Sequence, residues 1–190
     1  MQLTVLLQIE WEKKLIIQYK DLIDLREKYK NKNISICTGT FDLFHYSHLM
    51  LLKYIKEHSD ILVVVVKCDK DVKSKGTNRP IINEYERAII VDNIKYTDYT
   101  IISSYNYKTP LIDKLIEKNN YTQTDIYKLK RDGFIFEKLR PNVLYVTDDK
   151  KVSKGLLDIC KEINTKVEII PIQGNNFHTS DIIKKIISNK

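Results

Sequence analysis

The chain has 190 residues, enough for one compact domain with a substantial core and too few for two of ordinary size. Its composition, 43% hydrophobic and 30% charged with only 5 glycines and 4 prolines, excludes the collagen-like and low-complexity classes. The net charge of +7 comes from lysines scattered along the chain, so we expect a solvated basic surface and no nucleic-acid-binding stripe.

The cysteines and the N-terminal residues favour a cytoplasmic protein. Cys37, Cys68 and Cys160 are odd in number and lack C-x-x-C spacing, so neither a disulfide framework nor a zinc site is predicted. Residues 1–9 are apolar but carry no basic leader and no cleavage site. No stretch approaches the roughly 20 apolar residues that span a bilayer, so membrane insertion is not expected.

The first predicted element is an amphipathic helix over residues 11–29, because apolar side chains recur there at three- and four-residue steps. It belongs to an N-terminal helical extension of residues 1–33. A short strand is predicted at 34–38 and a helix at 49–55. The β-branched run at 61–66 is typical of a strand covered on both faces of a parallel sheet, which completes a βαβ unit.

The same alternation continues toward the C-terminus and predicts one domain over residues 34–190. The remaining expected elements are helices at 84–95, 110–118, 156–163 and 180–187 and strands at 99–102, 142–146 and 167–171. Five parallel strands with helices on both faces form an α/β fold, a Rossmann-like doubly wound sheet.

One segment does not fit this alternation. Residues 119–136 are rich in Asn, Thr, Tyr and Lys, and they lie between a helix and a strand where a short connection is expected. We predict a surface insertion or a lid there, with outer bounds at residues 118 and 137.

The loop after the first predicted strand, Gly39-Thr-Phe-Asp-Leu-Phe-His45-Tyr-Ser-His48, is the strongest candidate for chemistry. Ligands of open parallel sheets bind at the carboxyl ends of the strands, where this loop lies. Gly39 lets the backbone approach a ligand, and the amides at the following helix start favour phosphate oxygens. His45 and His48 can face one side of the first helical turn and donate hydrogen bonds to a reacting phosphate. A zinc pair, or two histidines satisfied at a helix start, are the alternatives.

This loop resembles the G-x-F-D-x-x-H-x-G-H signature of the cytidylyltransferase-like nucleotidyltransferases. Members of this family join a nucleotide monophosphate from CTP or ATP to a small phosphorylated substrate and release pyrophosphate. The resemblance implies that His45 and His48 are catalytic. It also implies further site residues in the loop, namely Gly39, Thr40 and Phe41 for the nucleotide and Asp42 for the substrate.

Two weaker matches follow the second predicted strand. Lys75 stands where the family has a lysine that binds the phosphates of substrate and nucleotide, with Lys73 as a possible substitute at the substrate. A solvated loop lysine is the alternative. The stretch Asn83-Glu-Tyr-Glu-Arg87 is similar to the family's N-E-x-E-R, which implies nucleotide binding by Arg87. An ion pair of Arg87 with Glu84 at the helix start is an equal alternative.

The last match lies at the final predicted helix. Thr179-Ser180-Asp181-Ile-Ile183 resembles the family's S-T-S-D-I-I, whose hydroxyls and amides bind the triphosphate. An ordinary helix cap is the alternative for Thr179 and Ser180. Asp148, after the strand at 142–146, is also carried over as a nucleotide-binding residue.

Three positions depart from the family pattern. Ser47 replaces the glycine of H-x-G-H, His178 stands at the first serine of the last motif, and Pro171-Ile-Gln-Gly174 replaces the usual R-T-x-G. Because the missing arginine removes a charge-assisted phosphate contact, a nucleotide-binding module without turnover is the alternative to an enzyme.

The resemblance favours CTP as the nucleotide. Residues 41–45, 83–87 and 179–183 are similar to the choline-phosphate and ethanolamine-phosphate cytidylyltransferases of phospholipid biosynthesis, so we expect CTP and a phosphorylated alcohol, glycerol phosphate included. The alternative is ATP and a sugar phosphate, because residues 75–80 are similar to bacterial adenylyltransferases acting on heptose 1-phosphate. With either nucleotide we expect Mg²⁺ to arrive on the phosphates, without a dedicated protein cage. Members of the family are commonly dimers, so a homodimer is a candidate assembly.

Overall fold

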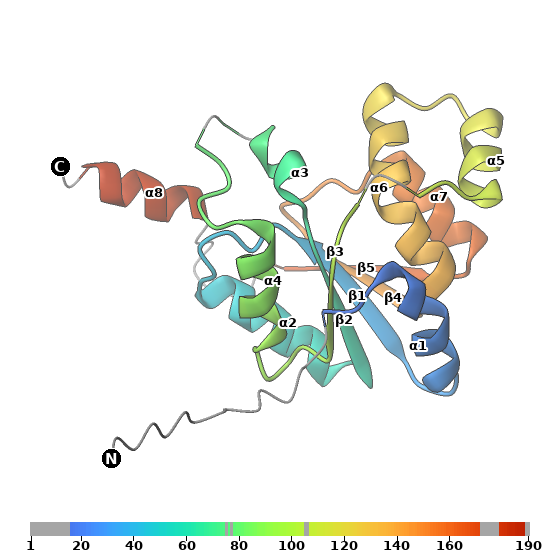
Figure 1. The fold of residues 1–190 in the computed structure, drawn as a ribbon, viewed down its shortest axis with the longest axis horizontal. Coiled ribbons are helices and arrows are strands. Elements are labelled where there is room, and N and C mark those ends of the chain that lie inside the picture. The colour runs from blue at the N-terminus through green and yellow to red at the C-terminus, as the bar shows by residue number, and fades with distance from the viewer. Residues whose placement is uncertain (1–15, 75, 77, 105–106, 172–178, 189–190) are drawn as a thin grey trace, which may run out of the picture.

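A single five-stranded parallel sheet organises the protein (Figure 1). The computed structural model describes residues 16–74, 76, 78–104, 107–171 and 179–188. The strands are β1 (Ile34–Gly39), β2 (Ile61–Val66), β3 (Tyr99–Ile102), β4 (Val143–Thr147) and β5 (Lys166–Ile170). Their order in the sheet is β3-β2-β1-β4-β5, and every pair is parallel. The predicted Rossmann-like α/β fold is confirmed.

Helices connect the strands and cover the sheet. Those that the structure describes are a 3-10 turn η1 (Tyr19–Asp21), α1 (Leu22–Lys28), α2 (Tyr46–Glu57), α3 (Asp69–Lys73), α4 (Glu84–Asp92), α5 (Pro110–Lys118), α6 (Gln123–Leu139), α7 (Lys154–Glu162) and α8 (Thr179–Ser188). Within the described ranges, no helix is both long enough and apolar enough to cross a membrane.

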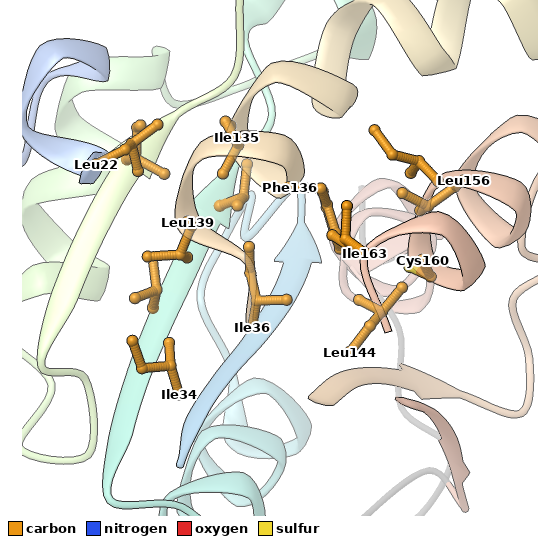
Figure 2. Packing of buried hydrophobic residues seen from close by; sticks show 14 of the residues in the cluster. Leu22, Ile34, Ile36, Ile135, Phe136, Leu139, Leu144, Leu156, Cys160 and Ile163 are labelled. Atoms are coloured by element: carbon orange, nitrogen blue, oxygen red, sulfur yellow. The ribbon is translucent and has the colours of Figure 1, made fainter. Parts of the chain in front are cut away.

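The sheet separates two hydrophobic cores because successive side chains of a strand point to opposite faces. On β2, Val63 and Val65 belong to the core formed with α1, α5, α6 and α7, whereas Val64 and Val66 belong to the core formed with α2 and α4. Figure 2 shows the first core, where Ile36 of β1 and Phe136 of α6 are among the packed side chains. The continuous apolar run of β2 is therefore buried on both faces, as its sequence predicts.

The N-terminal helix is shorter than the prediction of residues 11–29. Ile16 forms a parallel bridge with Thr100, and the Ile17 amide donates to the Thr100 carbonyl at 2.8 Å, so the chain is extended here along the edge strand β3. The backbone N–H of Gln18 donates to the Asp21 carboxylate at 2.8 Å, which starts the helical turn at this point. Helix α1 begins only at Leu22, and residues 11–15 lie outside the described residues.

The prediction of a surface insertion at residues 119–136 is wrong. Most of this segment belongs to α6, a 17-residue helix whose N-cap Thr122 accepts a hydrogen bond from the Asp125 amide. Leu129 and Phe136 are fully buried in the core that α6 shares with α1, α5 and α7. The helical period was hidden because Arg131 and Asp132, two charged residues, are also buried and pair with each other.

Candidate active site

The site lies where the direction of strand succession reverses. From β1 the chain adds β2 and β3 on one side, and later adds β4 and β5 on the other. Loops that leave the carboxyl ends of β1 and β4 therefore diverge and leave a crevice, the usual ligand site of such sheets. The predicted signature loop, residues 39–48, leaves β1 at this point and enters α2.

Gly39 is required by the packing of the loop itself. A Cβ atom at this position would lie 2.6 Å from two atoms of the Phe41 ring, far inside van der Waals contact. Phe41 has a φ of 55° and is 1% exposed, so its ring folds back over the glycine into the core. The structure therefore gives both residues a packing function, whereas their predicted contact with the nucleotide stays a prediction.

The two histidines lie together at the strand-to-helix corner. Their ring centroids are 3.9 Å apart, with 27° between the ring planes. Phe41 and Phe44 flank the His48 ring at centroid distances of 5.2 and 5.5 Å, which fixes its orientation. The His45 backbone N–H points at Nδ1 of His48 at 3.4 Å, so the neutral His48 ring carries its proton on Nε2. The corner thus presents two partly exposed imidazoles side by side.

The zinc alternative for this pair lacks support in the described part of the chain. No three side chains of His, Cys, Asp or Glu gather there in a way that could hold a metal ion. Structural zinc sites use four protein ligands and catalytic ones three.

Asp42 connects the signature loop to the segment that precedes α4. Its side chain is 1% exposed, and its carboxylate accepts from the Ile81 amide, the Ile82 amide at 3.1 Å and the Arg79 guanidinium at 2.9 Å. Burial alone would raise the pKa of Asp42, but these amides and Arg79 together lower it below its usual value. These bonds give Asp42 a function in positioning the two loops, whereas its predicted contact with the substrate stays a prediction.

Thr179 brings the last motif to the first one. Its hydroxyl donates to the backbone carbonyl of Asp42 at 2.7 Å, so the start of α8 lies against the signature loop. Ser180 follows in the first turn of α8 and is exposed. The two motifs, separated by 137 residues along the chain, therefore meet. Their predicted binding of the triphosphate is not tested by this contact.

Arg87 is fully buried, with 0% of its side chain exposed, and it does not make the alternative ion pair with Glu84. Its predicted contact with the nucleotide stays a prediction. Its ion pair is with Asp69 at 2.7 Å, and Glu84 instead accepts from the Asp69 amide. The guanidinium also donates to the carbonyls of Thr40 and, at 2.8 Å, Lys67, the residues that follow β1 and β2. Arg87 thus ties the two strand ends together.

The remaining predicted residues are placed less centrally. Asp148 follows β4 and is exposed, and its amide donates to the carbonyl of Ile170 at 3.0 Å. Lys73 is exposed in the last turn of α3. Lys75 and His178 lie outside the described residues, as does most of the stretch that replaces the family's R-T-x-G.

Sequence reasoning missed a basic wall on the other side of the crevice. A cavity of about 200 Å³ extends over the ends of β1 and β4, from Thr38 to Thr147. A second cavity of about 510 Å³ lies between α3 and α6. Both are lined by Lys67, Lys128 and Arg131. Of these three residues, only Lys67 could have been predicted from the sequence to lie near a ligand site, because it directly follows a predicted strand.

The histidine pair lies at the reversal point of a doubly wound sheet, where nucleotide-binding α/β proteins bind their ligands. Residues 36–186 match the family model described as Cytidylyltransferase-like. The chain therefore belongs to the cytidylyltransferase-like family of nucleotidyltransferases.

Named relatives agree with this family. The chain is 29% identical over 184 residues to the bifunctional protein HldE of Campylobacter jejuni subsp. doylei, a match that covers 96% of this chain and 33% of the relative. It is 33% identical over 135 residues to FAD synthase of Thermococcus sibiricus, covering 66% of this chain and 91% of that protein. The chain thus spans about a third of the length of the HldE proteins it matches.

Solved structures share the fold. Pantoate-beta-alanine ligase of Francisella tularensis superposes with a TM-score of 0.58 at 17% identity, covering 91% of this chain and 77% of that one. The lipopolysaccharide core biosynthesis protein of Thermoplasma volcanium gives a TM-score of 0.50 at 22% identity, covering 76% and 99%. At these identities the likeness concerns the fold alone.

Proposed function

We propose that the chain transfers a nucleotidyl group from a nucleoside triphosphate to a small phosphorylated acceptor and releases pyrophosphate. The observation that carries this proposal is the pair of imidazoles, 3.9 Å apart, at the carboxyl edge of β1. A single anion placed at this corner can receive hydrogen bonds from both rings.

In the proposed reaction, a phosphate oxygen of the acceptor attacks the α-phosphorus of the nucleotide. The new bond joins these two atoms, and the bond from the α-phosphorus to the oxygen that bridges to the β-phosphate breaks. Negative charge grows on the α-phosphate oxygens and on the departing pyrophosphate. His45 and His48 stabilise that charge by hydrogen bonding, which lowers the barrier when it strengthens in the transition state. Mg²⁺ is proposed to enter as part of the nucleotide substrate.

The scaffold around the corner supports this assignment. Phosphoryl-type transfer needs little covalent help, so precise placement of donors is the main contribution of the protein. Asp42 and Arg87, both buried, hold the signature loop and its surroundings through hydrogen bonds to five separate backbone groups. Ser47, which departs from the family's glycine, is buried in a helical position of α2 and needs no glycine conformation. This favours an enzyme over a binding module without turnover.

For the nucleotide we propose ATP, with CTP as the second candidate. The relative named FAD synthase supports ATP, because its product contains an adenylyl group, and the match spans 135 residues. The similarity of residues 41–45 to the choline- and ethanolamine-phosphate cytidylyltransferases supports CTP and a phosphorylated alcohol. That similarity, with those of residues 83–87 and 179–183, rests on three short motifs, whereas the match to FAD synthase is continuous over 135 residues.

The test is pyrophosphate release by the purified chain with Mg²⁺, with ATP or CTP, and with a panel of phosphorylated alcohols and sugars. We expect release that requires both a nucleotide and one class of acceptor, with a nucleotidylated product in the mass spectrum. Nucleotide binding without release for every acceptor would contradict the proposal and leave the binding module.

A further inference from the structure

The two cavities beside α6 offer a binding site that the histidine corner does not explain. We call the cavity of about 200 Å³ the inner cavity and the one of about 510 Å³ the outer cavity. The inner cavity is lined by Thr38, the residue before Gly39, and by Leu51, one helical turn beyond His48. The inner cavity therefore lies beside the elements that flank the signature loop, although neither histidine is among its lining residues.

Arg131 forms a rigid part of the wall that the cavities share. Its guanidinium lies between Asp71 of α3 and Asp132 of α6 and pairs with both, including a bond from Nε to Asp132 at 2.8 Å. Tyr127 donates its hydroxyl to Asp71 at 2.8 Å, which completes the cluster. Arg131 is 6% exposed, so its orientation is set by these partners and by packing. The cluster joins α3 to α6 and fixes the width of the outer cavity.

The charge of the cavity lining is positive even with this cluster included. Both carboxylates of the lining, Asp71 and Asp132, are paired with Arg131. Lys67 after β2 and Lys128 of α6 line both cavities, and the inner cavity adds two more lysines, Lys150 and Lys151. Four lysines therefore contribute to a lining whose carboxylates already bind an arginine. Such a lining attracts anions and repels cations.

The uncharged part of the lining fits a hydroxyl-rich molecule. Hydroxyl groups come from β1, β4 and α3, at Thr38, Thr147 and Ser74. A quaternary or primary amine would instead need an aromatic cage or an available carboxylate. Tyr127 uses its hydroxyl on Asp71, and no aromatic pair encloses either cavity among their lining residues.

We propose that α6 and the end of β2 form the acceptor site of this enzyme, and that the acceptor is an anionic polyol, a sugar or polyol phosphate, bound between Lys67 and Lys128. This inference rests on the proposed function, because the inner cavity places such a molecule beside the elements that flank the signature loop. It selects among the acceptors that the family resemblance leaves open, and it disfavours phosphocholine and phosphoethanolamine.

Steady-state kinetics of two lysine variants test the site. In pyrophosphate-release assays we expect Lys67→Ala and Lys128→Ala each to raise the acceptor KM about tenfold or more, the usual effect of losing one charge-assisted hydrogen bond. The nucleotide KM should change less than about twofold. Lys128→Arg should restore most of the acceptor affinity, and Lys161→Ala, an exposed lysine of α7 outside both cavities, is the matched control. An unchanged acceptor KM in both alanine variants would overturn the proposal.

Direct binding separates this inference from the proposed function. Calorimetry with glucose 1-phosphate, glycerol 3-phosphate and phosphocholine should detect binding of the first two, weakened in Lys128→Ala. Binding of this kind without any pyrophosphate release would refute the enzymatic function and leave the anion site intact. Turnover with a preference for phosphocholine would support the enzymatic function and refute the anionic-polyol acceptor site. Neither binding nor turnover with the two polyol phosphates would overturn the acceptor site, and absence of pyrophosphate release with every acceptor would overturn the enzymatic function as well.

Discussion

The two sides of the crevice are held in place by different kinds of interaction. The histidine corner is a loop, and buried polar groups fix it, because Asp42 and Arg87 bind backbone amides and carbonyls. The opposite wall is a 17-residue helix, α6, and apolar packing of residues such as Leu129 fixes most of it. Directional hydrogen bonds can hold a loop in one conformation, and apolar packing with one buried ion cluster does the same for a helix, so both sides of the crevice are rigid. Our proposals place the chemistry on one side and the choice of acceptor on the other.

The largest expected effect is on the α6 side, from Arg131→Met. This variant leaves Asp71 and Asp132 buried beside each other without their cation. We expect a loss of about 3–5 kcal/mol in the free energy of unfolding, the usual cost of breaking a buried ion pair on one side. Denaturant unfolding measures it. A companion variant, Lys130→Met on the same helix, should lose far less, since Lys130 has no ion pair in the described residues. Equal losses of unfolding free energy in the two variants would mean that the buried ion cluster of Arg131 does not stabilise the fold.

On the corner side, His48→Ala should affect turnover and leave stability nearly unchanged. We expect kcat to fall about 10²–10³-fold with little change in either KM, since the contact strengthens mainly in the transition state. His58→Ala is the matched control, because His58 lies at the other end of α2 and stacks on Tyr54. Wild-type turnover in His48→Ala would remove His48 from the mechanism.

A smaller effect on stability is expected from Gly39→Ala. The added Cβ would meet the Phe41 ring at 2.6 Å, so the ring must leave its buried position. We expect a loss of about 1–3 kcal/mol, typical of overpacking, together with reduced turnover because Phe41 also supports His48. Thermal unfolding and pyrophosphate release measure the two effects. Unchanged thermal stability in Gly39→Ala would contradict the close packing of the Phe41 ring on this glycine.

The smallest expected effect concerns pH. The folded protein holds the pKa of Asp42 below its usual value, so the ionised carboxylate stabilises the fold above the unfolded pKa of about 3.9. That contribution is lost as the pH falls below this value and through the lowered pKa. Asp42→Asn should therefore be less stable than the wild type near pH 7, and the difference should shrink below pH 4. A difference that is constant from pH 7 to pH 3 would contradict the ionised state of Asp42.

The sequence predicted regular elements and local motifs well. The limits of β2, β3 and α5 agree with the predictions, because a β-branched run defines a strand and Pro110 after the N-cap Thr109 starts a helix. The proximity of His45 and His48 was also predictable from their three-residue spacing, although His45 is the extended N-cap residue of α2 and His48 its third residue, so the two meet through the geometry of a helix start.

Burial and long-range contacts were not predictable. The sequence does not indicate that the side chain of Arg87 is buried in the protein. The spacing of residues in a helix shows which side chains share a face, but it does not show what that face contacts. Lys67 and Lys128 come from segments 61 residues apart, and only the packing of α6 brings them to one wall. The charged pair Arg131 and Asp132 concealed that packing, since buried charges interrupt the apolar period on which the prediction of a helix depends.

The bond from the Thr179 hydroxyl to the Asp42 carbonyl bears on how the protein matures during synthesis. A ribosome releases the chain from the N-terminus onward, so the histidine pair emerges well before this hydroxyl, and β5, the last strand of the sheet, ends only nine residues before it. A nascent chain that stops short of residue 179 lacks the bond that holds the start of α8 against the signature loop. If this contact matters for the proposed activity, the activity requires residue 179 to have emerged.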